Sequence, residues 1–209
     1  MDKRKKYLSL CISLITLSVF CLTGCGKEKT TVEESYSINE VTAMRINADT
    51  WNTDIMVSAD ENIHIHFDGS ISNGEEKPST SLQNGILSVT QQGNSEGLQD
   101  QISLGKKGQI TIYLPSECNI PLTLENGMGD IEIDSISTQE FSLNNSSGYA
   151  TISSVTADNM KVSSGSGDIT IKQGSADEVK IGTSSGYVQI NETVLNHAEV
   201  TTKSGETTI

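Results

Sequence analysis

The sequence predicts an all-β protein organised as a parallel β-solenoid with 19-residue coils, preceded by an irregular strand-rich N-terminal section. Two observations lead to this prediction. Glycine recurs every 19 residues in the C-terminal part, and only 4% of the 209 residues are aromatic. Between the glycines, short apolar pairs alternate with polar residues, which is typical of strands with one buried face. A solenoid buries a narrow aliphatic column and therefore needs few aromatic rings.

Residues 1–24 are interpreted as a lipoprotein signal peptide. Four basic residues at positions 3–6 precede an apolar stretch over residues 7–22, which is too short to span a bilayer comfortably. The segment runs into the tetrapeptide Leu22-Thr23-Gly24-Cys25. This tetrapeptide resembles the bacterial lipobox, and the resemblance implies that Cys25 receives a lipid and becomes the first residue after cleavage. The alternative is an uncleaved N-terminal anchor, which would also leave residues 26–209 outside the cytoplasmic membrane.

Residues 25–37 are expected to form a lipidated tether, because they are polar and show no apolar period. Once the leader is removed and Cys25 is lipidated, Cys118 is the one cysteine that remains. No disulfide can then form within one chain. No His or acid stands near Cys118 at a spacing that indicates a nucleophile, so we expect it to be a bystander.

The charge balance narrows the possible partners. Residues 25–209 contain ten Lys or Arg and 26 Asp or Glu residues, a formal charge of −16. Contacts with phosphates need a Lys/Arg patch, so nucleic acid is excluded as a partner. Such a surface favours cations or cationic peptides instead.

Residues 38–120 are expected to form the irregular section, as a cap or as irregular first coils. Stretches rich in Gly, Asn, Ser and Gln at 68–84 and 91–101 are expected to be loops. Alternating apolar residues mark the strand candidates Met44/Ile46/Ala48, Ile55/Val57, Ile63/Ile65/Phe67, Ile86/Val89 and Ile110/Ile112/Leu114.

The repeat occupies residues 121–209, with the glycines Gly129, Gly148, Gly167, Gly186 and Gly205. Nearly all positions two, four, twelve and fourteen after each glycine are apolar. Each repeat therefore predicts two short strands, each paired in parallel with its equivalent one repeat later. The glycines are expected where a turn needs a positive φ or a close backbone contact. Because the sequence ends at Ile209 within a repeat, we expect the solenoid to be truncated there or shielded by something outside it.

Two motifs carry a resemblance to a known family. Residues 110–115 read Ile-Thr-Ile-Tyr-Leu-Pro, and residues 166–171 read Ser-Gly-Asp-Ile-Thr-Ile. Over residues 38–209 the chain resembles a bacterial family of adhesin-like proteins with a β-strand-repeat domain of unknown function. Tyr149 and Tyr187 depart from the family's acidic residue in the repeat motif. The resemblance implies the fold and a place at the cell surface, implies adhesion more weakly, and offers no catalytic residues.

Side chains one and three positions after each glycine are expected to point outward and to stack into two columns. The second column consists of Glu132, Thr151, Thr170, Gln189 and Thr208. Exposed tyrosines beside acids and hydroxyl groups could stack on sugar rings or hold a cationic peptide. Alternatively, Tyr and Thr are ordinary residues of an exposed strand. The candidate ligand-binding residues are Asp130, Tyr149, Thr151, Asp168, Thr170, Tyr187, Gln189 and Glu206.

Two further outward columns are expected to carry solvated cross-strand pairs worth a few tenths of a kcal/mol each. They consist of Glu140, Asn159, Glu178 and His197, and of Ser142, Lys161, Lys180 and Glu199.

Metal sites are not expected. His64 and His66 share one face of a strand, but a third ligand is missing, so an exposed polar face is the favoured interpretation. Asp130 and Asp168 follow glycines, yet the 19-residue repeat lacks the acidic nonapeptide of calcium-binding β-rolls. No cofactor is indicated either.

We expect the protein to be a non-enzymatic, extracytoplasmic lipoprotein at the outer face of the cell membrane. Its adhesin-like solenoid is expected to bind a surface glycan, a protein or a cationic peptide. The alternative is a regulatory or protective role in envelope stress, through capture of cationic antimicrobial peptides. A remote alternative is an enzyme acting on cell-wall glycan. Such an enzyme needs a catalytic pair of carboxylates, and the sequence does not single out a pair among its 26 acids. The oligomeric state stays open.

Overall fold

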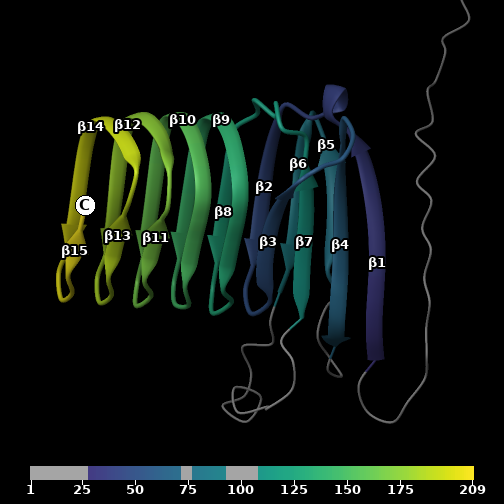
Figure 1. Cartoon of the computed structure of the whole chain (residues 1–209). Helices are drawn as coiled ribbons and strands as arrows, with labels where there is room; N and C mark the ends of the chain where they lie inside the picture. The colour runs from purple at the N-terminus through teal and green to yellow at the C-terminus, as the bar shows by residue number, and fades with distance from the viewer. Residues whose placement is uncertain (1–27, 72–76, 93–107) are drawn as a thin grey trace, which may run out of the picture.

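The computed structural model describes residues 28–71, 77–92 and 108–209, which fold into fifteen strands and one 3₁₀ helix (Figure 1). The all-β class predicted from the sequence is confirmed. Within these ranges, no helix is long and apolar enough to cross a membrane. The 3₁₀ helix covers Ile38–Glu40, and the strands are β1 (Glu28–Ser37), β2 (Ala43–Ala48), β3 (Asn52–Val57), β4 (Asn62–Ile71), β5 (Ser79–Gln83), β6 (Ile86–Gln91), β7 (Gln109–Leu114), β8 (Leu122–Asn126), β9 (Ile131–Asn145), β10 (Ala150–Ser164), β11 (Ile169–Ile171), β12 (Gly174–Thr183), β13 (Val188–Ile190), β14 (Thr193–Thr202) and β15 (Thr207–Thr208).

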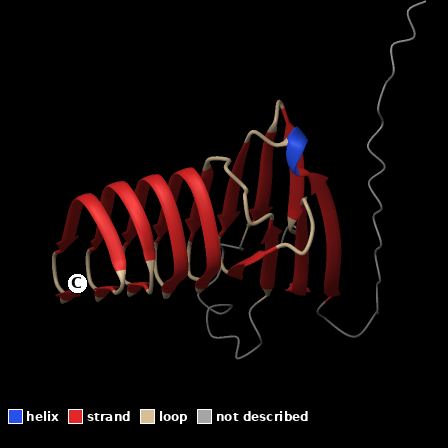
Figure 2. Ribbon diagram, turned by 45° about the horizontal axis from the view of Figure 1, so that its top comes forward, coloured by secondary structure: helices blue, strands red, loops and turns tan. Residues whose placement is uncertain are grey.

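Strand pairing divides the molecule into two faces. The first face has the order β1-β4-β7-β3-β9-β10-β11-β13-β15. The second face has the order β5-β6-β2-β8-β9-β10-β12-β14. β9 and β10 belong to both, because they start in the first face and end in the second. Figure 2 shows the long strands arching from one side of the molecule to the other.

Parallel pairing with a constant offset of 19 residues relates the strands from β9 onward. On the first face, Ala150 pairs with Ile169, and Ile169 pairs with Val188. On the second face, Met160 pairs with Val179. Where two short strands per repeat were predicted, β9 and β10 are each a continuous strand of 15 residues, whereas β11 and β12 are separate. The sequence pattern therefore located the register of this part but not the continuity of its strands.

The N-terminal part makes the sheet mixed rather than uniformly parallel. β4 is antiparallel to β1 and β7, and β5 is antiparallel to β6. In contrast, β2 and β3 are parallel to their partners β6, β8, β7 and β9. The β5–β6 hairpin turns at Asn84 and Gly85, both with positive φ (51° and 80°). An Asn-Gly pair favours this tight turn because both residues tolerate that backbone conformation.

One sequence-based expectation for the N-terminus is wrong. Residues 28–37, expected to belong to a tether, form β1, which pairs along its whole length with β4. Val32 and Tyr36 pack against the core from this strand. The strand was not predicted because its side chains are largely polar and show no apolar alternation. Its position is set by main-chain hydrogen bonds to the edge strand β4.

A single core lies between the two faces and consists mainly of Ile, Val, Leu, Met and Ala. Its buried aromatic residues are Trp51, Phe67 and Phe141. In β14, which has no strand beyond it among the described residues, Val194 is 66% exposed. The core is therefore a thin aliphatic layer, as expected for a chain with so few aromatic residues.

Candidate ligand-binding face

The predicted columns lie on the first face as two adjacent rows. The tyrosine row consists of Asp130, Tyr149, Asp168, Tyr187 and Glu206, and the hydroxyl row consists of Glu132, Thr151, Thr170, Gln189 and Thr208. Parallel pairing aligns the hydroxyl row from strand to strand. Backbone hydrogen bonds from Ile131 N to Tyr149 O (2.8 Å) and from Ile169 N to Tyr187 O (2.8 Å) align the tyrosine row. Tyr149 and Tyr187 are 63% and 59% exposed.

The aspartates of the tyrosine row are bound to the backbone of the next coil. Tyr149 N donates to Asp130 Oδ1 (3.0 Å), and Tyr187 N donates to Asp168 Oδ1 (2.9 Å). Each aspartate thus satisfies an amide at the start of the following strand. The bond leaves the second carboxylate oxygen, Oδ2, without a hydrogen-bond partner among the described residues. The two rows therefore present tyrosine rings next to carboxylates whose orientation is fixed.

One acidic and one amide side chain of β3, Asp54 and Asn52, continue the rows toward the N-terminal part of the face. Asp54 on β3 is the direct partner of Glu132, and Asn52 Oδ1 accepts a hydrogen bond from Asp130 N (3.0 Å). Burial raises the pKa of Asp54, and the neighbouring Glu132 charge raises it further, against a hydrogen bond from Gln109. Neither row contains a basic residue among its described members, so this part of the face carries a negative potential.

The repeat glycines allow the turns before the rows to stack closely. A Cβ atom on Gly167 would overlap the carbonyl oxygen of Gly148, and the same clash recurs at Gly186 and Gly205 against the glycine one coil earlier. Gly148 also has a φ of 103°, which disfavours any L side chain. The predicted need for close contact is therefore confirmed at the described repeat turns, while a positive φ occurs at Gly148 alone of the repeat glycines.

A buried polar row next to these turns was missed from the sequence. It occupies the position three residues before Gly129, Gly148, Gly167 and Gly186. Asn145 Nδ2 donates to Gly148 O (2.8 Å), and Asn126 Nδ2 donates to Asn145 Oδ1 (2.9 Å). In the next coil, Gly167 N donates to Ser164 Oγ (2.9 Å). The signal was a polar residue recurring every 19 positions on the apolar face of the strand, as Asn126, Asn145, Ser164, Thr183 and Thr202.

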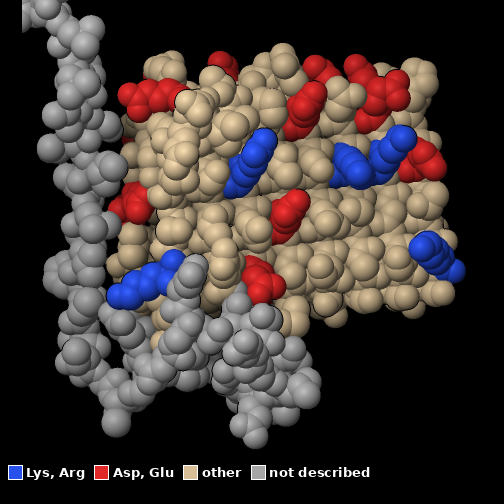
Figure 3. Space-filling model, turned by 180° about the vertical axis from the view of Figure 1, so that it is seen from behind, with Lys and Arg blue, Asp and Glu red and all other residues tan. Residues whose placement is uncertain are grey.

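The second face shows the expected pattern of mixed-sign neighbours in part. Register stacks Lys161 directly on Lys180, and no ion pair within 4.0 Å involves either lysine in the described part of the chain. His197 Nδ1 lies 3.4 Å from Glu178 Oε1, a contact that is an ion pair only when the imidazole is protonated. Figure 3 shows basic side chains in a row across the face turned away in Figure 1. Register also sets Lys180 beside Glu199 and Glu178 beside His197, so these columns combine one like-charge pair with neighbours of opposite sign.

The remaining candidates stand apart from the first-face rows. His64 Nε2 lies 3.0 Å from Asp60 Oδ1, and burial raises the pKa of the Cys118 thiol. Within the described residues, no group of three or more His, Cys, Asp or Glu side chains could hold a metal ion. The lipobox residues Leu22, Thr23, Gly24 and Cys25 lie outside the described residues.

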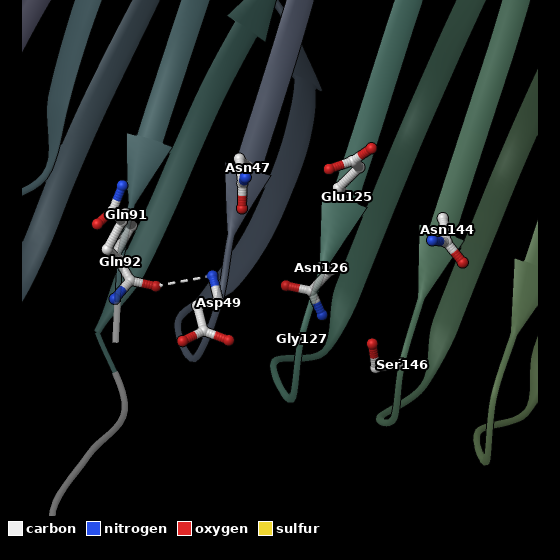
Figure 4. Close-up of a pocket in the computed structure, with 9 residues that line it drawn as sticks. All are labelled: Asn47, Asp49, Gln91, Gln92, Glu125, Asn126, Gly127, Asn144 and Ser146. Carbon is white, nitrogen blue, oxygen red and sulfur yellow. Dashed lines mark hydrogen bonds between the residues drawn. The ribbon is translucent and has the colours of Figure 1, made fainter. Parts of the chain in front are cut away.

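An open polar depression of about 410 Å³ lies where the strands of the second face end. Figure 4 shows Asp49, Glu125 and Asn126 among the side chains that line it. Gln91 Oε1 accepts hydrogen bonds from the backbone amides of Asp49, Thr50 and Trp51 at 3.1, 2.9 and 3.2 Å. The role of Gln91 is therefore to hold the β2–β3 turn.

The chain matches a family model and several solved structures. Solved structures that the chain matches include a candidate cell adhesion protein from Clostridium sporogenes, 14% identical, with a TM-score of 0.49 over 86% of this chain and 100% of that chain. A candidate adhesin from Bacteroides fragilis is 10% identical, with a TM-score of 0.32 over 86% of this chain and 97% of that chain. No functionally curated protein matches the chain. The family model for the Toastrack DUF4097 domain matches residues 41–209, which include every strand from β2 to β15. The chain therefore belongs to the Toastrack DUF4097 family.

Proposed function

We propose that this chain is a non-enzymatic binding module held at the outer face of the bacterial membrane by a lipid on Cys25. In this proposal β9 to β15 form a parallel β-solenoid with 19-residue coils, and its first face is the binding surface. The constant 19-residue register from β9 onward supports the solenoid description. Each coil lengthens the face by about 4.8 Å, so equivalent side chains recur at a fixed spacing along it. Such a surface suits a ligand that itself has a repeating structure.

The observation that carries the proposal is the exposure of Tyr149 and Tyr187 in one row. Both residues are more than half exposed, and the other members of their row are the acidic residues Asp130, Asp168 and Glu206. Tyrosine provides a large contact area at a small cost in side-chain entropy. The backbone-bound carboxylates of Asp130 and Asp168 provide fixed hydrogen-bond acceptors beside the rings. Flat rings with fixed polar groups between them can bind sugar rings by stacking and by hydroxyl contacts.

A second candidate function is the capture of cationic peptides in envelope stress. The formal charge of −16 over residues 25–209 favours it, as does the acidic character of both rows. A complex of this kind depends on long-range attraction, so it should weaken steeply as salt is added. Stacking on a neutral sugar should hardly change over the same range.

The test compares the full chain with its Tyr149→Ala/Tyr187→Ala variant on a glycan array and in pull-downs from bacterial envelope extracts. We expect the double variant to lose at least tenfold in affinity for the ligand that the wild type binds. Met56→Ala/Val57→Ala is the matched control, because it removes two exposed apolar side chains from β3 of the same face. Far-UV circular dichroism and a thermal midpoint verify that the variants fold. Equal binding by wild type and the tyrosine variant would contradict the proposal.

A further inference from the structure

We infer that the ligand of the tyrosine row is a β-1,4-linked polymer of amino sugars whose amines are free and positively charged. This inference rests on the proposed binding role of the row and adds the chemical class of the ligand. Three features of the first face support it: the spacing of the tyrosines, the position of the carboxylates and the sign of the surrounding charge.

The spacing of the two rings matches an alternating sugar chain. Tyr149 precedes β10 and Tyr187 precedes β13, with β11 between them, so the rings are two strand spacings or about 9.6 Å apart along the row. In a β-1,4-linked pyranose chain each ring is turned over relative to the last. Every second sugar therefore shows the same face, at the length of one disaccharide. An extended peptide repeats its side chains on one face every ~6.6 Å, which fits the two rings less well.

The carboxylates lie where they would meet groups on the sugars between the two stacked rings. Asp168 occupies the intervening position of the row, and its Oδ1 atom is held by Tyr187 N. The Asp168 Oδ2 atom has no hydrogen-bond partner in the described part of the chain. Because Asp168 is already oriented by the backbone, a donor on the ligand can bind it with little further ordering. An ammonium group can bind this carboxylate and also lie near a tyrosine ring face, which adds a cation–π attraction.

The sign of the charge separates an amino sugar from a neutral one. Asp54, Asp130, Glu132, Asp168 and Glu206 all belong to the two rows or pair directly with them. Lys172 is the basic residue closest to the rows along the repeat sequence, two positions after Thr170. Its Nζ atom donates a hydrogen bond to Ser153 Oγ (3.4 Å). A chain of ammonium groups therefore meets a carboxylate on every second coil, at Asp130, Asp168 and Glu206. An acetylated chain has the same rings without these charges.

The test measures binding of the full chain, by isothermal titration calorimetry, to three hexamers: glucosamine, N-acetylglucosamine and lysine. We expect the glucosamine hexamer to bind at least tenfold more tightly than either of the others at low salt. Asp168→Asn should abolish most of that preference, because the amide oxygen still accepts the Tyr187 N–H while the charge is gone. Glu140→Gln is the matched control, since it removes one negative charge from the second face and should leave the preference intact.

The other outcomes separate this inference from the proposed function. Equal or tighter binding of the N-acetylglucosamine hexamer that is lost in Tyr149→Ala/Tyr187→Ala would overturn the inference and support the binding role of the row. Equal or tighter binding of the lysine hexamer would show that charge alone selects the ligand, which also overturns the inference. Binding of the glucosamine hexamer that does not depend on the two tyrosines would overturn both.

Discussion

Replacing Asn145 by alanine should lower the free energy of unfolding by about 2–6 kcal/mol. Asn145 is fully buried. Its Nδ2 group donates to Gly148 O (2.8 Å), and its Oδ1 atom accepts from Asn126 Nδ2 (2.9 Å). The alanine variant loses both bonds. Each bond contributes roughly 0.5–1.5 kcal/mol, and a buried partner left unsatisfied costs a further 1–3 kcal/mol or so.

The neighbouring Asn144 provides the matched control. It points outward and accepts one exposed hydrogen bond from Ser163 Oγ (3.1 Å), so Asn144→Ala should cost less than about 0.5 kcal/mol. Asn145→Ser should fall between the two variants, because Ser164 occupies the equivalent slot one coil later. Urea unfolding with linear extrapolation measures all three, and the slope against urea should stay constant. If Asn145→Ala and Asn144→Ala differ by less than about 0.5 kcal/mol, the buried polar row does not stabilise the turns.

Two further changes probe the close stacking of the turns and the acidic rows. Gly167→Ala should lower the thermal midpoint of unfolding far more than Gly182→Ala. A Cβ atom on Gly167 would overlap the carbonyl oxygen of Gly148, whereas a Cβ atom on Gly182 would meet the end of a threonine side chain. Equal midpoints would argue against close stacking as the reason for the repeat glycines. Asp54→Asn should stabilise the fold at neutral pH, since burial and Glu132 raise the pKa of Asp54 above its unfolded value of 3.8. The folded state then binds more protons than the unfolded state just above pH 3.8, so wild-type stability decreases as the pH rises through that window. The advantage of Asp54→Asn, measured by urea unfolding at a series of pH values, should therefore shrink toward pH 3.8, and a constant advantage would contradict the assignment.

The repeat part of the fold could be predicted because its contacts are periodic along the chain. A residue of one coil pairs with the residue 19 positions later, so the spacing of Gly148 and Gly167 already contains the register that joins β10 to β11. The alternation of apolar and polar residues in each coil likewise separates the core side from the outer side. The exposed positions of Tyr149 and Tyr187 follow from that alternation.

The N-terminal part could not be predicted in the same way, because its partners are distant in the sequence. β3 lies between β7 and β9, and β2 lies between β6 and β8. Asn52 reaches Asp130 across 78 positions. No repeat links such segments, and a polar strand such as β1 shows no apolar period. The position of β1 is determined by its pairing with the edge strand β4, which the sequence pattern does not reveal.

By itself, the sequence determined the all-β class, the 19-residue register and the outward position of the tyrosines, because alternation and spacing are local properties of the chain. Only the tertiary structure decided that the sheet is mixed, that β1 joins it and that Asn126, Asn145 and Ser164 form a buried polar row. It also decided that Asp130 and Asp168 each bind the backbone of the following coil. These features depend on which segments meet in space, and main-chain groups and carboxylates pair with whatever partner the packed strands bring within hydrogen-bond distance.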